Sequence, residues 1–361
     1  MSSPARATRV LLVDGGAAPG AHLAELVAGA PDLDLAGRAR PSEGLREAAR
    51  SEPDVVLLDL QAQRMESFTF LRLMGRRRTT PVLAVAPAAR RGDLYRALEL
   101  GALDVLERPD APGSPEAFRE ELRERCAGAC GRWGPRGAPP RQGIPAARTR
   151  RWAGRAPAAG VRVAALGAST GGPKALQRLL AALPGEVPLA ILVAQHMPGR
   201  FTAPFAERLR RTTALEAREA ADGDLLVPGR ILVAPGGQDM EVSRDEAGRH
   251  RVKVLPAEAR GIRCAPSVDR LFASLAAAAG PRACGVVLTG MGDDGREGIR
   301  AIRRRGGLTL AESADTAVVY GMPLAAAESG AVDEVLALGA IPGRLLRFAG
   351  GGEEPWRSFT R

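Results

Sequence analysis

Short apolar segments alternate with amphipathic ones along the first 110 residues of the chain. Between the apolar runs, apolar residues recur at helical spacing, as in LREAAR and LYRALELGA. The five runs are TRVLLVD, LDLAGRA, PDVVLLDL, PVLAVA and ALDVLE. Strands that alternate with helices in this way form a parallel sheet covered on both faces. This part of the chain is therefore predicted to be an α/β domain with a five-stranded parallel sheet.

A second α/β pattern begins near Val161. Its predicted strands are VRVAALG, LAILVAQ, GRILVAP, RVKVL, ACGVVLTG and GLTLAES. Helical stretches such as ALQRLLAAL, APFAERLRR and VDRLFASLAAAA lie between most of them. The segment RILVAPGGQDMEVSRDEAGRHRVKVL instead predicts antiparallel strands joined by turns. We expect a doubly wound, Rossmann-like domain with a mainly parallel sheet and an antiparallel hairpin.

A stretch without a periodic pattern separates the two domains. Residues 131–160 contain seven arginines, no acidic residue and many Pro, Gly and Ala. This composition cannot bury enough apolar surface to pack. We assign residues 1–127 to the first domain, 128–160 to an Arg/Pro/Gly-rich linker, 161–350 to the second domain and 351–361 to a C-terminal tail.

Charge and composition exclude several classes of protein. The net charge is +10, but residues 111–160, with 10 basic and 4 acidic residues, account for more than half of it. Basic residues elsewhere are mostly matched by acids, so no nucleic-acid partner is expected. No apolar run reaches the roughly 18 residues of a membrane helix, and we expect a cytoplasmic protein without membrane insertion. The four cysteines are too scattered for a disulfide framework or a zinc site, and no metal site is predicted.

The glycine-rich loop GASTGGPK follows the strand VRVAALG. A Walker phosphate loop needs Lys directly after its second glycine, where this chain has Pro173, and the dinucleotide motif needs glycine where it has Ser169. The same letters match G-x-S-x-G between a strand and a helix, the setting of a nucleophile elbow. A serine before a helix can also be an ordinary N-cap, so the motif by itself leaves both interpretations open.

A nucleophilic serine needs a base and a carboxylate. His196 ends the strand after Ser169, and Asp293 and Asp294 follow the strand ACGVVLTG. Because the carboxyl ends of parallel strands meet at one edge of a sheet, these residues are predicted to converge. The order Ser, His, Asp differs from that of the α/β-hydrolases, which argues against that fold.

Six motifs in the second domain together resemble one protein family. Between residues 167 and 323 they occur in the order GASTGG, QHM with FAERL, DGDLLVPGRILVAPG, PSVDRLF, LTGMGDDG and VVYGMP. They resemble the catalytic domain of CheB-type chemotaxis methylesterases, which also carry an N-terminal receiver. The resemblance implies that Ser169 is the nucleophile, His196 the base and Asp294, the second of the acidic pair, the acid of a catalytic triad.

By this resemblance the protein is a protein-glutamate methylesterase and protein-glutamine glutaminase. Its substrates would be glutamate γ-methyl esters or glutamines on methyl-accepting chemoreceptors, and catalysis needs no cofactor. Thr170, Met291 and Gly292 match positions beside the active site, where backbone amides would form an oxyanion hole, and Arg263 matches a position near the substrate. A non-catalytic chemosensory scaffold and a serine esterase for a small-molecule ester remain alternatives.

Two segments near the expected substrate groove depart from the family pattern. The hairpin reads Gly237-Gln238-Asp239, and Ala265 stands where the family has a second arginine. We expect these departures to affect receptor recognition and to leave the triad untouched.

The first domain resembles the flavodoxin-like receiver domain of response regulators. Asp59 matches the phosphoacceptor, and Asp14 matches one of the two acids that bind magnesium in such domains. The remaining pocket positions differ, because Gly15 replaces the second acid, Ala86 the Ser/Thr and Arg108 the Lys.

These replacements argue against ordinary phosphorylation of Asp59. Mg²⁺ prefers several hard oxygen ligands, and this pocket has lost a carboxylate and a hydroxyl. We favour a receiver fold that is kept as a docking surface or inhibitory cap. A chemosensory histidine kinase is the partner expected if Asp59 does accept a phosphoryl group, and a solvated carboxylate without chemistry is the third interpretation.

Overall fold

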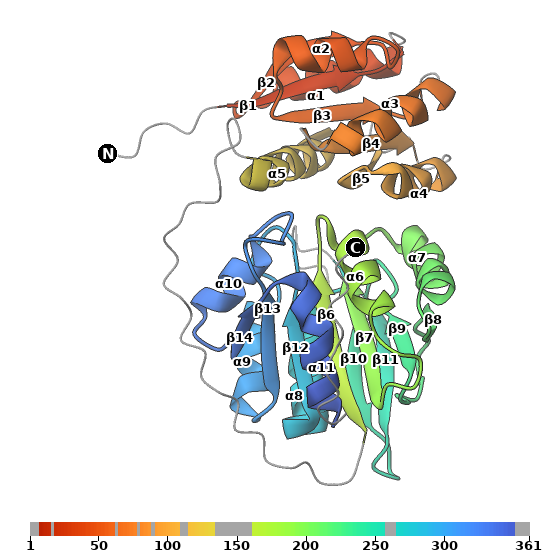
Figure 1. The fold of residues 1–361 in the computed structure, drawn as a ribbon, viewed down its shortest axis with the longest axis vertical. Helices are drawn as coiled ribbons and strands as arrows, with labels where there is room; N and C mark the ends of the chain where they lie inside the picture. Colours follow the sequence, from red (N-terminus) through yellow and green to blue (C-terminus); the bar gives the residue numbers. More distant parts are fainter. Residues whose placement is uncertain are drawn as a thin grey trace. The chain divides into compact units, whose positions relative to one another are not determined.

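The computed structural model describes residues 7–15, 18–61, 64–77, 80–87, 91–108, 115–133, 161–256 and 265–350. The chain divides into two compact units, the first within residues 1–142 and the second within 143–361 (Figure 1). Most of the predicted linker and the whole predicted tail lie outside the described residues. None of the described helices is both long enough and apolar enough to cross a membrane.

The N-terminal unit is a parallel sheet with helices on both faces, as predicted. Its strands follow the order β2-β1-β3-β4-β5, and every pair is parallel. This order is that of flavodoxin-like folds. The elements are β1 (Thr8–Val13), α1 (Ala18–Ala28), β2 (Leu33–Ala39), α2 (Gly44–Ser51), β3 (Val55–Asp59), α3 (Arg64–Arg77), β4 (Val82–Pro87), α4 (Arg91–Leu100), β5 (Asp104–Arg108) and α5 (Pro115–Trp133).

Helix α5 extends to Trp133, so the assignment of residues from 128 onward to the linker is wrong for the first part of that segment. Phe118, Leu122, Cys126 and Ala129 are buried in one core cluster together with residues of α1 and the central strands. Their spacing puts them on one face of a helix. The arginines and glycines of the same stretch obscured this apolar face in the sequence pattern.

The C-terminal unit is built on a seven-stranded sheet in the order β14-β13-β12-β6-β7-β9-β8. All of its strand pairs are parallel, and the hairpin β10-β11 forms a separate antiparallel sheet. The elements are β6 (Arg162–Ala168), α6 (Gly172–Ala181), β7 (Leu189–Gln195), α7 (Gly199–Thr212), β8 (Glu216–Glu219), β9 (Arg230–Val233), β10 (Gln238–Arg244), β11 (His250–Pro256), α8 (Val268–Ala279), η2 (Gly280–Arg282), β12 (Ala283–Val287), α9 (Arg296–Arg304), β13 (Leu308–Glu312), α10 (Met322–Glu328), β14 (Glu334–Leu336), η3 (Leu338–Ala340) and α11 (Ile341–Ala349).

The prediction of a doubly wound α/β domain with an antiparallel hairpin is confirmed. The sequence pattern missed β8 and β14, which are short edge strands of four and three residues. Edge strands are half exposed and so lack the continuous apolar run that marks a buried parallel strand.

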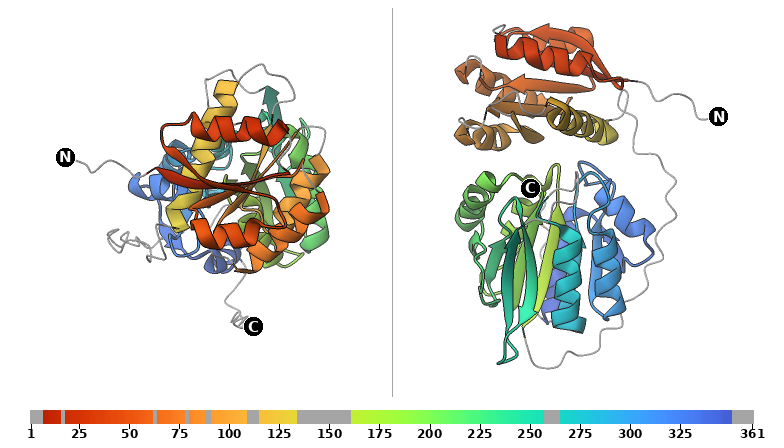
Figure 2. Two further views of the ribbon diagram at one scale, coloured as in Figure 1. Left: turned by 90° about the horizontal axis from the view of Figure 1, so that it is seen from above. Right: turned by 180° about the vertical axis from the view of Figure 1, so that it is seen from behind.

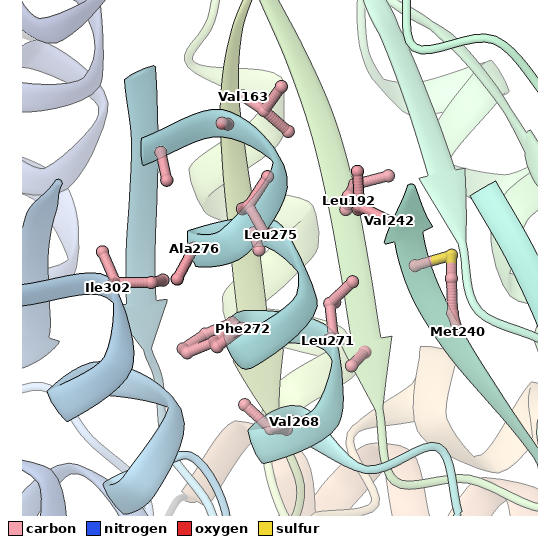
Figure 3. Close-up of a cluster of buried hydrophobic side chains, with 14 of the residues drawn as sticks. Val163, Leu192, Met240, Val242, Val268, Leu271, Phe272, Leu275, Ala276 and Ile302 are labelled. Carbon is pink, nitrogen blue, oxygen red and sulfur yellow. The ribbon is translucent and has the colours of Figure 1, made fainter. Parts of the chain in front are cut away.

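Helix α8 is the centre of the core on one face of this sheet (Figure 3). It presents Leu271, Phe272 and Leu275 to a cluster that also includes Val163 of β6 and Met240 of β10. Helix α9 lies beside α8 over the same face, as the view from behind shows (Figure 2). The start of α8 is thereby fixed at the edge of the sheet where β6, β7 and β12 end.

The burial of Phe272 allows a test of this core. Phe272 is fully buried, and a Cβ at Gly285 would lie 3.3 Å from its ring, so little space exists for the surroundings to collapse. Phe272→Ala is expected to lower the free energy of unfolding by about 3–5 kcal/mol, measured by urea unfolding followed by far-UV circular dichroism. The exposed control Glu297→Gln should change it by less than about 0.5 kcal/mol. Equal effects of the two substitutions would contradict the assignment of this core.

Candidate active site

Three neighbouring parallel strands bring the predicted triad residues to one sheet edge. Strand β6 pairs with β7 on one side and with β12 on the other. Ser169 follows β6 directly, His196 follows β7 directly, and Asp294 lies in the loop after β12. The register sets Ala168 opposite Gln195, so the residues that follow the two strands are adjacent.

Ser169 lies in a tight turn between β6 and α6. Its amide donates to the Thr289 carbonyl at 3.0 Å, and its own carbonyl accepts from the Gly172 amide at 2.8 Å. Gly171 has φ +78°, a conformation that favours glycine, and a Cβ at Gly290 would lie 2.8 Å from the Ser169 Cβ. The small residues of the motif are therefore needed for the turn. Ser169 itself is buried and only 6% exposed.

His196 is held from two directions. Its backbone amide donates to the Ala168 carbonyl at 3.0 Å, and its Nε2 lies 2.8 Å from Asp294 Oδ2. Asp294 therefore takes Nε2, which leaves Nδ1 as the ring nitrogen available to Ser169. Among the described residues, no hydrogen bond joins the Ser169 hydroxyl to the imidazole. Catalytic hydrogen bonds are often long or poorly aligned without substrate and form fully only when the substrate binds.

Asp294 is positioned by the N-terminus of α8. Its two carboxylate oxygens accept from the backbone amides of Val268 and Asp269, both at 2.8 Å. Burial acts to raise the pKa of Asp294, but the hydrogen bond and charge of His196 and the two amides outweigh it and hold the pKa below its usual value. Asp294 is thus kept ionised beside His196, where a carboxylate orients an imidazole and stabilises its protonated form.

A further set of contacts, which the sequence pattern does not indicate, supports the residues that bind Asp294. Asp239 is buried and accepts from the Ser267 amide at 2.8 Å and from Arg270 Nη1 at 3.0 Å. The Ser267 hydroxyl in turn lies 3.4 Å from Asp294 Oδ1. This departure from the family pattern therefore supports the start of α8, whereas the neighbouring Gly237 and Gln238 are exposed.

Of the other predicted site residues, some lie near the Ser169 turn and one lies outside the described residues. The structure brings Thr170 next to the loop after β12, because the Thr289 hydroxyl donates to the Thr170 carbonyl at 2.9 Å. In that loop the Gly290 carbonyl accepts a hydrogen bond from the Met322 amide at 2.8 Å, which holds the residue before Met291 in place. Gly292, the residue after Met291, has φ +85°, a conformation that favours glycine. Arg263 lies outside the described residues. The Ala265 carbonyl accepts a hydrogen bond from the Gly237 amide at 3.3 Å.

In the receiver-like unit, both acidic side chains of the predicted pocket lie against arginines. Arg38 Nε donates to buried Asp14 at 2.8 Å, and Arg108 Nη1 lies 3.7 Å from buried Asp59. Arg108 also donates to the Gln61 side chain.

This arrangement does not fit a magnesium ion. Gly15 and Ala86 supply no side-chain oxygen, and the two arginines bring positive charge to the two carboxylates that remain. Within the described ranges, no cluster of three or more His, Cys, Asp or Glu side chains could hold a metal.

The lowered pKa of Asp294 predicts a pH-dependent stability. An ordinary aspartate has a pKa of 3.8, so a carboxyl with a lower folded pKa contributes stability above about pH 4 and loses it as the pH falls through the folded value. The difference in free energy of unfolding between wild type and Asp294→Asn should therefore shrink between about pH 5 and pH 3 in urea titrations. A difference for Asp294→Asn that stays constant over this range would contradict the assignment.

Known proteins share this architecture and sequence. The CheB methylesterase family matches residues 164–345. Protein-glutamate methylesterase/protein-glutamine glutaminase 6 of Anaeromyxobacter dehalogenans is 54% identical over 359 residues, which cover 97% of this chain and 98% of the relative. Protein-glutamate methylesterase/protein-glutamine glutaminase 3 of Geobacter sulfurreducens is 40% identical over 369 residues, which cover 96% and 98%.

A solved structure gives the same result for the C-terminal unit. The crystal structure of the Thermotoga maritima CheB methylesterase catalytic domain is 34% identical and matches with a TM-score of 0.51, covering 52% of this chain and 99% of that one. The family match spans half of the chain, and the curated relatives span nearly all of it. The chain therefore belongs to the CheB methylesterase family.

Proposed function

We propose that this protein is a serine hydrolase that demethylates glutamate γ-methyl esters and deamidates glutamines on chemoreceptors. The observation that carries the proposal is the hydrogen bond between His196 and Asp294, at the sheet edge where the Ser169 turn also lies. The relatives at 54% and 40% identity bear the names of both activities, which fixes the class of bond that is cleaved.

Proton transfer in this site runs through Nδ1 of His196. The Asp294 carboxylate accepts a hydrogen bond from the protonated Nε2 of His196, so the neutral imidazole has its lone pair on Nδ1. As the Ser169 oxygen attacks the substrate carbonyl, Nδ1 takes its proton and later gives it to the departing methanol or ammonia. Water repeats the same steps on the acyl-enzyme and leaves a glutamate side chain and free Ser169.

Negative charge develops on the substrate carbonyl oxygen during each attack. Backbone amides at Thr170 and in the loop at Met291 and Gly292 lie near the Ser169 turn and are the proposed donors to this oxygen. One such donor contributes about 10²–10³-fold in rate. Two backbone hydrogen bonds hold these segments in place before substrate binds. The Met322 amide donates to the Gly290 carbonyl, and the Ser169 amide donates to the Thr289 carbonyl.

Chemoreceptors are the proposed partners. The receiver-like unit is proposed to act as a docking or inhibitory element whose state does not depend on Mg²⁺ and phosphoryl transfer. The ion pairs Arg38–Asp14 and Arg108–Asp59 support this proposal, because they supply positive charge where a metal ion and a lysine would be needed.

Removal of the nucleophile or base tests the proposed reaction. Ser169→Ala is expected to lower the rate of methanol release from methylated receptor membranes by about 10⁴-fold or more, and His196→Ala by about 10²–10⁴-fold. Ser243→Ala and the exposed His22→Ala are matched controls that should retain full activity. Near-normal methanol release by Ser169→Ala would disprove the assignment. A rate on a simple aryl ester that exceeds the rate on receptors would favour a small-molecule esterase instead.

The receiver pocket predicts how the activity responds to a phosphoryl mimic. Beryllofluoride with Mg²⁺ should produce little change in methanol release by the full chain, because Arg38 and Arg108 already neutralise Asp14 and Asp59. The measurement compares initial rates with and without the mimic, for wild type and for Asp59→Asn. A several-fold activation that is lost in Asp59→Asn would show that the pocket still binds metal and phosphoryl groups.

A further inference from the structure

We infer that Gln195 is a positioning residue that ties the nucleophile to the base, an inference that rests on the proposed function. Gln195 is the last residue of β7 and is 2% exposed. Its side-chain Nε2 donates to the Ser169 carbonyl at 2.9 Å and to the His196 carbonyl at 3.0 Å. One primary amide therefore spans the backbones of the two residues between which a proton must pass.

The contacts determine which end of the Gln195 side-chain amide faces the two carbonyl oxygens. Both neighbours at Nε2 are carbonyl oxygens, which accept hydrogen bonds and cannot donate them, so the two N–H groups must point toward them. The Ser169 carbonyl also accepts from Gly172, whereas Gln195 is the only donor to the His196 carbonyl in the described part of the chain.

The second glycine after Thr170 makes room for this side chain. A Cβ at Gly172 would overlap Gln195 Oε1 and would lie 2.8 Å from the Ala168 Cβ. Gly172 is the first residue of α6 and has no positive φ, so its need for glycine comes from these two close approaches. The paired glycines of GASTGG thus have separate roles, since Gly171 makes the turn and Gly172 admits the Gln195 amide.

The oxygen of the Gln195 side chain indicates that this residue does more than fill space in the core. Its Oε1 is buried without a hydrogen-bond partner among the described residues. A buried acceptor without a partner lowers stability, and an apolar side chain of similar shape would avoid that cost. The amide is explained if its two donors are required to fix Ser169 relative to His196.

Proton transfer is sensitive to such a connection. His196 and Ser169 are also joined through the Ala168 carbonyl, which accepts from the His196 amide at 3.0 Å. That hydrogen bond joins the two backbones at one point. The Gln195 amide adds one contact to the Ser169 backbone and one to the His196 backbone. A displacement of about 1 Å in a reacting group can cost about 10²-fold in rate. Substrate affinity depends on other contacts, so the loss should appear in kcat.

Steady-state kinetics of the full chain on methylated receptor membranes test the inference. Gln195→Met keeps the shape of the side chain and removes both donors. It is expected to lower kcat by about 10- to 100-fold with KM little changed and with the folded state intact at the assay temperature. The matched control is Gln177→Met, which removes an amide that accepts from Arg208 at 2.9 Å between α6 and α7. The control should keep wild-type kcat.

Gln195→Glu gives a second and independent signature. An ionised carboxylate would face two carbonyl oxygens, so burial and repulsion should raise the pKa of this carboxyl group. Below that pKa the protonated group can donate one hydrogen bond. The ratio of its kcat to the wild-type kcat should therefore rise as the pH is lowered, and the same ratio for Gln195→Met should not.

The outcomes separate this inference from the proposed function. If wild type and Ser169→Ala release methanol at the same rate, the proposed function fails. If wild type is active through Ser169 and Gln195→Met has the same kcat per folded molecule, with only a lower melting temperature, the role of Gln195 is structural and the inference is overturned. A lowered kcat with unchanged KM, together with the pH-dependent ratio for Gln195→Glu, supports it.

Discussion

The pairing of β6 with β7 on one side and β12 on the other is the constraint on which the rest of this protein depends. Parallel strands have their carboxyl ends at one edge, so a residue after each strand enters the same small volume. Three residues far apart in the sequence, Ser169, His196 and Asp294, meet there for this reason. The helices and the hairpin then set the orientation of what the strands bring together.

Helix α8 acts on this edge through its N-terminus. Its first amides bind Asp294, its side chains fill the core against β6, and Asp239 and Ser267 hold its first turn. Packing and electrostatics are therefore coupled, because the apolar face of α8 fixes the place where its amides stabilise a carboxylate. A change in the hairpin that carries Asp239 would affect Asp294 through this helix without contacting the His196 imidazole.

The two units differ in the groups that contact their carboxylates. In the C-terminal unit, the Asp294 carboxylate is balanced by amides and by an imidazole that can exchange protons. In the N-terminal unit, Asp14 and Asp59 lie against guanidinium groups, which remain protonated at all relevant pH values. Each of these ion pairs places a permanent positive charge beside a carboxylate. The fold of a receiver is thus retained with a different distribution of charge in its pocket.

The sequence by itself determined the two α/β folds, the hairpin and the types of residue at the strand ends, because apolar periodicity and short motifs are local properties. It did not reveal that α5 reaches Trp133, or that β8 and β14 border the second sheet, since their patterns are interrupted by charge or too short. Only the tertiary structure decided that Asp294 contacts Nε2 of His196 and that buried Asp239 binds the start of α8. It also decided that the Gln195 amide donates to the backbones of both Ser169 and His196. These contacts join residues from different strands and helices, and their geometry is set by packing.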